Sequence, residues 1–254
     1  METTESYKGG AIVAFLDILG YGSYIEDQWA DDSERVIVVM RGLSGFGELD
    51  GGLGGVIRSG TGAQLTAYVR VVSDSVLVCF PLPDRAHFAG AMITVARTVA
   101  WVWGWLLDKG LTLRGGIELG DAYWDRVTLT GPAPLAAYAI ESKVASSSRV
   151  VLGDTLVQAC VTQLPKYAFE EAHRDGVMET VAEGHDGLLV LDPKLTVDLW
   201  EDVTLDKVKQ DARILLDRNP NYRAKYEPLL GLLDGRKGIT WERFVEIAGA
   251  YPTC

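Results

Sequence analysis

Two aspartates occupy positions where a carboxylate could do chemistry. Asp17 lies inside the apolar run AIVAFLDILGYGSYI, residues 11–25. Burying an unpaired carboxylate costs several kcal/mol, so such a group is normally paired, hydrogen-bonded or bound to a metal. Asp74 follows Ser73 between two β-rich runs. Because divalent cations favour carboxylates, backbone carbonyls and water as ligands, the two aspartates together could hold a cation.

The elements around these aspartates follow an informative order. Apolar patterning and turn residues predict strand, helix, strand, strand, helix and strand at residues 11–19, 32–47, 65–72, 75–80, 85–109 and 111–120, with Asp31 or Asp32 capping the first helix. This is the order of the ferredoxin-like split unit, an α+β fold whose first and third strands lie side by side and antiparallel. Asp17, near the exit of the first strand, and Asp74, at the turn into the third, should therefore meet at one end of the sheet.

Each aspartate also has a plainer explanation. Aspartate is common in hairpin turns, which would account for Asp74, and Asp17 could be a buried hydrogen-bond acceptor. Gly20 and Gly22 follow the first strand and allow the backbone to turn tightly and approach a ligand closely. Two carboxylates on neighbouring strand ends beside a glycine turn favour the metal site over two separate explanations.

Composition and charge restrict the class of protein. The 254 residues are 48% hydrophobic and 23% charged, as in one large globular domain or a domain with a small appendage. The formal net charge of −11 argues against a nucleic-acid partner, because phosphate backbones require clustered lysine and arginine. A small anionic ligand held by a few local groups or metal ions is compatible with this charge.

The sequence predicts a cytoplasmic location. Its three cysteines, Cys79, Cys160 and Cys254, have no disulfide or C-x-x-C framework, and the first residues contain no apolar signal core. The most apolar stretch, 99–107, is far shorter than the roughly 20 residues of a membrane span, so we expect no membrane partner. We assign its three tryptophans to packing in the core or at a dimer interface: Trp101, Trp103 and Trp105.

Two further features are assigned to structure. The glycine-rich segment 47–62 lacks the G-x-x-x-x-G-K-[ST] pattern of a phosphate-binding loop, so a surface loop is predicted. Asp121 and Asp125, in GDAYWDR, resemble a second metal pair but are better explained by a hairpin tip.

Four motifs resemble a known family in order and spacing. FLDILGY, SDSVLVCF, LRGGIELG and GPAPLAAYAIESKVASSSRVVL, at residues 15–21, 73–80, 113–120 and 131–152, resemble the catalytic core of class III nucleotidyl cyclases. They are more similar still to the pyrimidine cyclases of bacterial Pycsar anti-phage systems, which make cyclic UMP or cyclic CMP. The resemblance implies a ferredoxin-like split βαβ cyclase core over residues 1–195 and a helical C-terminal extension over 196–254.

The resemblance also implies roles for individual residues. Asp17 and Asp74 would be the catalytic aspartates that bind two divalent cations, Mn²⁺ or Mg²⁺, with the carbonyl of Ile18 completing the ligand set. The backbone amides of four consecutive residues would face the triphosphate: Gly20, Tyr21, Gly22 and Ser23.

The resemblance also implies which residues would recognise the base. Tyr68 and Thr128 stand where purine cyclases read the base, and Tyr68 matches neither the adenylate nor the guanylate pattern, which favours a pyrimidine. A strand tyrosine packed in the core is an equally good explanation of Tyr68. Between UTP and CTP, the family favours UTP.

The chain departs from the purine cyclases at the positions of two transition-state donors. Leu135 and Ala139 replace an asparagine and an arginine, and no phosphate-binding lysine is evident in 165–192. Either turnover is slow or other cationic side chains replace these donors. A surface or ion-pair role also suits each candidate: Arg70, Arg114, Lys143 and Arg149.

The resulting hypothesis is a cytoplasmic, metal-dependent pyrimidine nucleotide cyclase. It would act as a homodimer with shared active sites, and its product would be a second messenger for a separate effector. A purine cyclase and a cyclase-like dimer that binds nucleotide without turnover are the alternatives.

Overall fold

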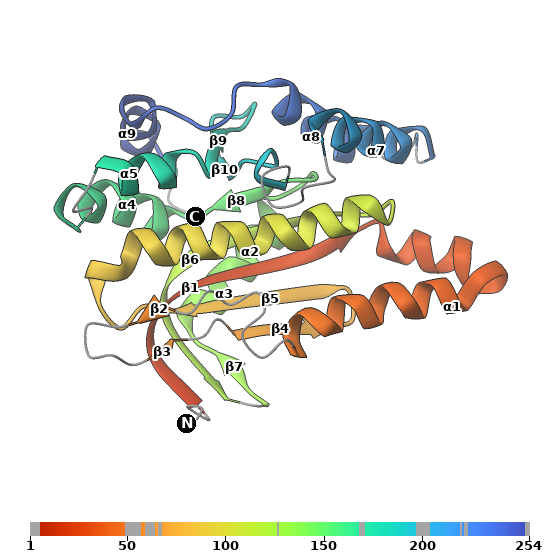
Figure 1. Cartoon of the computed structure of the whole chain (residues 1–254), viewed down its shortest axis with the longest axis horizontal. Coiled ribbons are helices and arrows are strands. Elements are labelled where there is room, and N and C mark those ends of the chain that lie inside the picture. Colours follow the sequence, from red (N-terminus) through yellow and green to blue (C-terminus); the bar gives the residue numbers. More distant parts are fainter. Residues whose placement is uncertain are drawn as a thin grey trace.

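A mixed β-sheet organises the chain (Figure 1). The computed structural model describes residues 6–48, 57–58, 64–65, 68–125, 127–167, 171–196, 204–218, 220 and 223–251. Within these residues the main sheet has the strand order β4-β5-β1-β6-β8-β10-β9, and β7 pairs with β6. Its strands are β1 (Ser6–Leu19), β4 (Tyr68–Val72), β5 (Ser75–Pro81), β6 (Thr112–Asp125), β7 (Leu129–Thr130), β8 (Val150–Leu152), β9 (Val181–Glu183) and β10 (Leu189–Leu191).

Helices cover both faces and one end of this sheet. They are α1 (Tyr21–Glu48), α2 (Phe88–Asp108), α3 (Pro132–Lys143), α4 (Asp154–Tyr167), α5 (Glu171–Met178), α7 (Leu205–Arg218), α8 (Arg223–Asp234) and α9 (Trp241–Gly249), with a short 3₁₀ turn, η1 (Arg85–His87), before α2. In Figure 1, the C-terminal helices lie beside β8–β10, on the opposite side of α2 from β4 and β5.

The predicted ferredoxin-like order is confirmed. β1 lies between β5 and β6 and is antiparallel to both, while β4 pairs with the outer side of β5. The register sets Asp17 opposite Ser75 on one side and Arg114 on the other. The α+β class, the hairpin before β5 and the long helix that ends near Gly110 are confirmed as well.

The two faces of the sheet have different partners. Alternate residues of β1, among them Ile12 and Leu16, join α2 in the main hydrophobic core. The intervening residues, among them Val13 and Phe15, belong to a smaller cluster with α3. Since successive strand residues point to opposite faces, Asp17 lies on the α3 face.

The long apolar helix is part of the core. A window within Arg85–Asp108 is apolar and long enough to cross a membrane, but 67% of it is buried inside the fold. Trp103 is fully buried and donates from Nε1 to Thr112 Oγ1 at 2.9 Å, while Trp101 and Trp105 pack against the same core. α2 also contacts α4, α5 and α7, and these contacts support the core-packing explanation of the tryptophans.

The predicted helix 32–47 is the second of two helices within α1. α1 begins at Tyr21, and a non-helical residue, Asp32 (φ −153°, ψ 67°), divides it, so the sequence located the second helix and missed the first. The apolar periodicity that predicted a helix begins only after this break, whereas the segment before it is mostly polar. Of the predicted glycine-rich loop, 57–58 pair with 64–65 as β2 (Ile57–Arg58) and β3 (Gln64–Leu65), and 49–56 and 59–62 lie outside the described residues.

The C-terminal helices share the core of the sheet. Leu215 of α7, Leu229 of α8 and Phe244 of α9 are buried in the same cluster as β1 and α2. An ion pair of 3.0 Å between Lys207 and Asp108 also joins α7 to the end of α2. A domain boundary near residue 195 stays a prediction, and the chain after it packs as part of one hydrophobic core.

Candidate active site

The two aspartates lie at adjacent strand ends. Asp17 is near the end of β1, and Asp74 lies in the tight turn between β4 and β5, where Ser73 has a positive φ of 56°. The Ile18 amide donates to the Asp74 carbonyl at 2.9 Å, which fixes this turn against β1. The structure therefore brings Asp17, Ile18 and Asp74 together at one edge of the sheet.

A third carboxylate, Glu141 on α3, joins them through an arginine. Arg114 Nε donates to Asp17 Oδ2 at 3.1 Å and lies 2.9 Å from Glu141 Oε1 as an ion pair. Glu141 Oε1 is buried and has no partner in hydrogen-bond geometry, so the second contact is electrostatic only. Glu141 itself is only 4% exposed.

Sequence reasoning missed Glu141, although a signal was present. Glu141 directly follows the apolar helical stretch PLAAYAI, residues 134–140. It is therefore a carboxylate next to apolar residues, the same anomaly that singled out Asp17. Its partner Arg114 is remote in sequence, so only the fold could show the pair.

Negative charge dominates this cluster. Burial raises the pKa of the Asp17 carboxyl, Arg114 opposes that rise, and the Asp74 charge adds to it. Burial likewise raises the pKa of Glu141, with Arg114 lowering it and both aspartates raising it. One guanidinium therefore contacts two carboxylates, and the charge of a third, Asp74, acts on both of them.

This arrangement fits a divalent cation. A buried carboxylate oxygen without a hydrogen bond, next to two further carboxylates, is the type of donor set that hard cations bind. Among the described residues, no group of three or more His, Cys, Asp or Glu is already arranged as a metal centre. Arg114 supplies the positive charge between Asp17 and Glu141, so cation binding would require that side chain or its partners to adjust.

The N-terminus of α1 opens directly beside the aspartates. Gly20 has a φ of +83°, which lets the chain turn from β1 straight into the helix. The first i→i−4 bond runs from the Tyr24 amide to the Gly20 carbonyl at 2.9 Å, so Tyr21, Gly22 and Ser23 form the first turn. Burial and the Asp74 charge both raise the pKa of Tyr21. Helix N-termini favour anions, including phosphates.

The remaining predicted residues form a second group. Arg70 donates from Nη1 to the Val127 carbonyl and, at 3.4 Å, to the hydroxyl of Tyr68. The Tyr68 ring lies 6.1 Å from that of Trp124. Thr128 lies in the β6–β7 turn, where its amide donates to Asp125 Oδ1 at 2.6 Å, so Asp125 is the hairpin-tip residue that the sequence predicted.

The two groups occupy different places along the strands. We name them the aspartate group (Asp17, Ile18, Gly20–Ser23, Asp74, Arg114 and Glu141) and the tyrosine group (Tyr68, Arg70 and Thr128). Tyr68 pairs with Cys79 and Asp17 pairs with Ser75, four positions along β5, which is roughly 13 Å. Arg114 and Asp125 are eleven positions apart on β6, but the β6–β7 hairpin curves back towards β4, where the Val127 carbonyl accepts from Arg70. The register places both groups on the same face of the sheet.

Two other candidate cations have different surroundings. The Arg149 side chain is 4% exposed, forms a 2.7 Å ion pair with Asp186 and donates to the Val144 carbonyl at 3.0 Å. The ion-pair interpretation therefore accounts for Arg149. Lys143 is exposed at the end of α3, as is Leu135 near its beginning.

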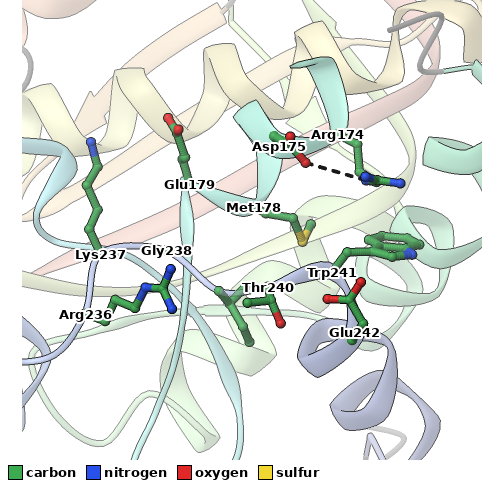
Figure 2. Close-up of a pocket in the computed structure, with 11 residues that line it drawn as sticks. Arg174, Asp175, Met178, Glu179, Arg236, Lys237, Gly238, Thr240, Trp241 and Glu242 are labelled. Carbon is green, nitrogen blue, oxygen red and sulfur yellow. Dashed lines mark ion pairs between the residues drawn. The ribbon is translucent and has the colours of Figure 1, made fainter. Parts of the chain in front are cut away.

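A cavity of about 390 Å³ lies away from both groups, between α5 and the segment that enters α9 (Figure 2). The Arg174 guanidinium lies 5.8 Å from the Trp241 ring and 3.6 Å from Asp175. Basic and acidic side chains both line this cavity, and none of the predicted site residues does.

Comparisons with known proteins identify no family. No family model matches the chain, and no curated protein is significantly similar to it in sequence. A class III adenylyl cyclase-like ATP-binding protein from Pseudomonas aeruginosa is 15% identical with a TM-score of 0.47, covering 68% of this chain and 40% of that protein.

Two further solved structures are similar to parts of the chain. The adenylyl cyclase CyaB from P. aeruginosa is 15% identical with a TM-score of 0.43, covering 62% of this chain and 83% of that one. A bacterial light-regulated adenylyl cyclase is 13% identical with a TM-score of 0.43, covering 83% of this chain and 100% of that one. Function is therefore inferred from the chain's own residues.

Proposed function

We propose that this protein is a metal-dependent nucleotide cyclase that converts a pyrimidine triphosphate, UTP or CTP, to its 3',5'-cyclic monophosphate and pyrophosphate. The observation that carries the proposal is the meeting of Asp17 and Asp74 at adjacent strand ends, beside the N-terminus of α1. Such a site offers carboxylates to cations and backbone amides to phosphates within one small region.

Each part of the aspartate group would have a defined role. Asp17, Asp74 and the Ile18 carbonyl would hold two Mn²⁺ or Mg²⁺ ions, which when bound would lower the pKa of the ribose 3'-hydroxyl and neutralise triphosphate charge. The first-turn amides of α1 would orient the phosphates for attack of that hydroxyl on the α-phosphate. Arg114, held by Glu141 at 2.9 Å, would add positive charge next to the departing pyrophosphate.

The resemblance to class III cyclases supports a shared site in a homodimer. Asp17 and Tyr68 are four positions apart along β5, and the geometry of that family would bring the base-reading residues from the other subunit. A two-fold axis would set the aspartate group of one subunit opposite the tyrosine group of the other and would generate two equivalent sites. Exposed apolar side chains next to both groups would supply contact area: Val72, Val127, Leu135 and Tyr138.

The resemblance to Pycsar enzymes supports the finer assignments. Tyr68 and Thr128 would read the base edge, with UTP favoured over CTP, and the cyclic product would activate a separate effector in bacterial anti-phage defence in the cytoplasm. A purine cyclase is the first alternative. The second, a dimer that binds nucleotide without turnover, is favoured by Leu135 and Ala139, which cannot act as donors.

Product analysis tests these alternatives. Purified protein would be incubated with ATP, GTP, CTP or UTP and with Mn²⁺ or Mg²⁺, and the products separated by chromatography and identified by mass. We expect cyclic UMP or cyclic CMP from the wild-type protein. Asp17→Asn should fold and lose activity by about a hundredfold or more.

Other outcomes would change the assignment. A cyclic purine as the main product would establish the first alternative, and tight nucleotide binding without any product would establish the second. Asp17→Asn with near-wild-type turnover in saturating Mn²⁺ would contradict the role of the aspartate group.

A further inference from the structure

The C-terminal helix α8 begins directly against the turn that leads into α1. Tyr226, in the first turn of α8, is 4% exposed, and its hydroxyl donates to the Leu19 carbonyl at 3.4 Å. A methyl group placed on Gly20 would lie 2.6 Å from the Tyr226 hydroxyl oxygen. The hydroxyl of a residue more than 200 positions away therefore rests on the turn between β1 and α1.

The same end of α8 is anchored to the other strand of the aspartate group. The Ser148 amide donates to the Lys225 carbonyl at 2.6 Å, and Ser148 is fully buried. The Ser148 hydroxyl lies 2.7 Å from Thr112 Oγ1, two positions before Arg114 on β6. α8 thus contacts the end of β1 through Tyr226 and the start of β6 through Lys225 and Ser148.

We propose that Tyr226 is a positioning residue for triphosphate binding, so that the C-terminal helices are a working part of the active site. This inference rests on the proposed function, in which the amides after Gly20 bind phosphate. Glycine has more backbone freedom than any other residue, so the direction of those amides must be fixed from outside the turn. Tyr226 does so by a hydrogen bond to the residue before Gly20 and by contact with Gly20 itself.

Removal of the Tyr226 hydroxyl alone distinguishes the positioning role from packing by the ring. Tyr226→Phe keeps the ring, and we expect it to raise both KM for the nucleotide and Kd for pyrophosphate in Mn²⁺ roughly fivefold. kcat should change less than about twofold, because the reacting groups stay in place. Pyrophosphate binding would be measured by isothermal titration calorimetry.

Tyr251→Phe is the matched control. Tyr251 lies in the same C-terminal segment, is similarly buried, and donates to the Leu152 carbonyl at 2.6 Å, away from the turn. Loss of the Tyr251 hydroxyl should lower the melting temperature and leave KM and the pyrophosphate Kd unchanged. An equal rise of KM and of the pyrophosphate Kd in both variants would overturn the inference. So would a Tyr226→Phe variant whose KM and Kd are within twofold of the wild-type values.

A double-mutant cycle tests the contact directly. Gly20→Ala introduces both a strained φ and a collision with the hydroxyl, whereas without the hydroxyl the nearest Tyr226 atom to the new methyl is Cζ at 3.9 Å. The loss of pyrophosphate affinity caused by Gly20→Ala should therefore be at least about threefold smaller in the Tyr226→Phe background. Additive effects would show that Tyr226 does not act on this turn.

The two hypotheses fail in different ways. If the wild-type protein cyclises no nucleotide but binds pyrophosphate, the proposed function is wrong, and the affinity ratios above still decide the role of Tyr226. If the wild-type protein cyclises nucleotide and the Tyr226→Phe variant has unchanged KM, only the positioning role is wrong. A wild-type protein that binds neither nucleotide nor pyrophosphate overturns both.

Discussion

Asp17, Glu141 and Arg114 show how one guanidinium can hold two carboxylates that would otherwise repel each other. Both carboxylates have a raised pKa because of burial, and Arg114 only partly offsets it. The same guanidinium must oppose a divalent cation that approaches the carboxylates. In the proposed mechanism, Arg114 and the cation would therefore compete for one negatively charged site until a triphosphate provided a second partner for the arginine.

This competition predicts opposite effects of one substitution. Arg114→Met should lower the melting temperature of the metal-free protein and raise its affinity for Mn²⁺ about three- to tenfold, because a neighbouring positive charge is removed. Affinity for the nucleotide should fall in the same variant. Calorimetric titration with Mn²⁺ alone and then with a nucleotide measures both.

Arg114→Lys is the control, since it keeps the charge and should leave the Mn²⁺ affinity near the wild-type value. A weaker Mn²⁺ affinity in Arg114→Met would mean that the arginine supports the cation site rather than competing with it.

The residues that sequence analysis could identify were those with local anomalies. Asp17 stood out against apolar neighbours, and Asp74 lay at a turn between two clear strands. Glu141 follows an apolar stretch and so carried a local signal, but its partner Arg114 and the Leu19 partner of Tyr226 lie far along the chain, so only the fold could show these two contacts. The start of α1 was missed for a related reason, because that segment has no apolar periodicity and begins at a turn set by Gly20.

At the scale of elements, the position of α3 depends on a close approach to β6. A methyl group on Gly116 would lie 2.6 Å from both the Ala137 carbonyl oxygen and Ile140 Cβ. α3 also carries Glu141, so this contact sets the distance between that carboxylate and Arg114.

Gly116→Ala should therefore destabilise the protein by about 1–3 kcal/mol and reduce turnover, because α3 must move away from the sheet. Gly231→Ala is the matched control: it lies in α8, where a methyl group meets nothing within 4 Å, and alanine should stabilise that helix by up to about 1 kcal/mol. Denaturant unfolding gives both free energies, and equal effects of the two substitutions would contradict this packing.

The β9–β10 hairpin is held by a buried charge. Burial raises the pKa of Asp186, but the hydrogen bond and the charge of Arg149, together with backbone hydrogen bonds, outweigh that effect, and the net pKa lies below the ordinary value. A lowered pKa stabilises the fold above the unfolded-state pKa of about 4, and this stabilisation is lost as the pH falls through the folded-state value.

Asp186→Asn should thus lower the free energy of unfolding by about 1–3 kcal/mol at pH 7, since it leaves Arg149 buried without its counter-charge. The difference from wild type should shrink as the pH falls below about 4. Asp175→Asn, which removes an exposed ion pair, should change stability by less than about 1 kcal/mol. If the free energy of unfolding of Asp186→Asn differed from that of the wild type by a constant amount over this pH range, the lost charge could not be the cause.

At the scale of the whole molecule, the sheet carries the aspartate group and the tyrosine group at separate places on one face. Because α2 lies in the core, the proposed dimer would use the face of the sheet that carries α3, which holds both groups. The C-terminal helices support the aspartate group through α8 and share the core of the sheet, so their removal should affect both stability and phosphate binding. The central claim is that two chains, arranged about a two-fold axis, complete each site.

Complementation between two inactive variants tests this claim most directly. Asp17→Asn damages only the aspartate group, and Tyr68→Ala damages only the tyrosine group. When the two are co-refolded in equal amounts, about half of the dimers should be mixed, and each mixed dimer has one site with both lesions and one with none. Cyclase activity should recover to roughly a quarter of the wild-type value if the sites act independently. No recovery, in a sample in which native mass spectrometry detects the mixed dimer, would contradict the shared site.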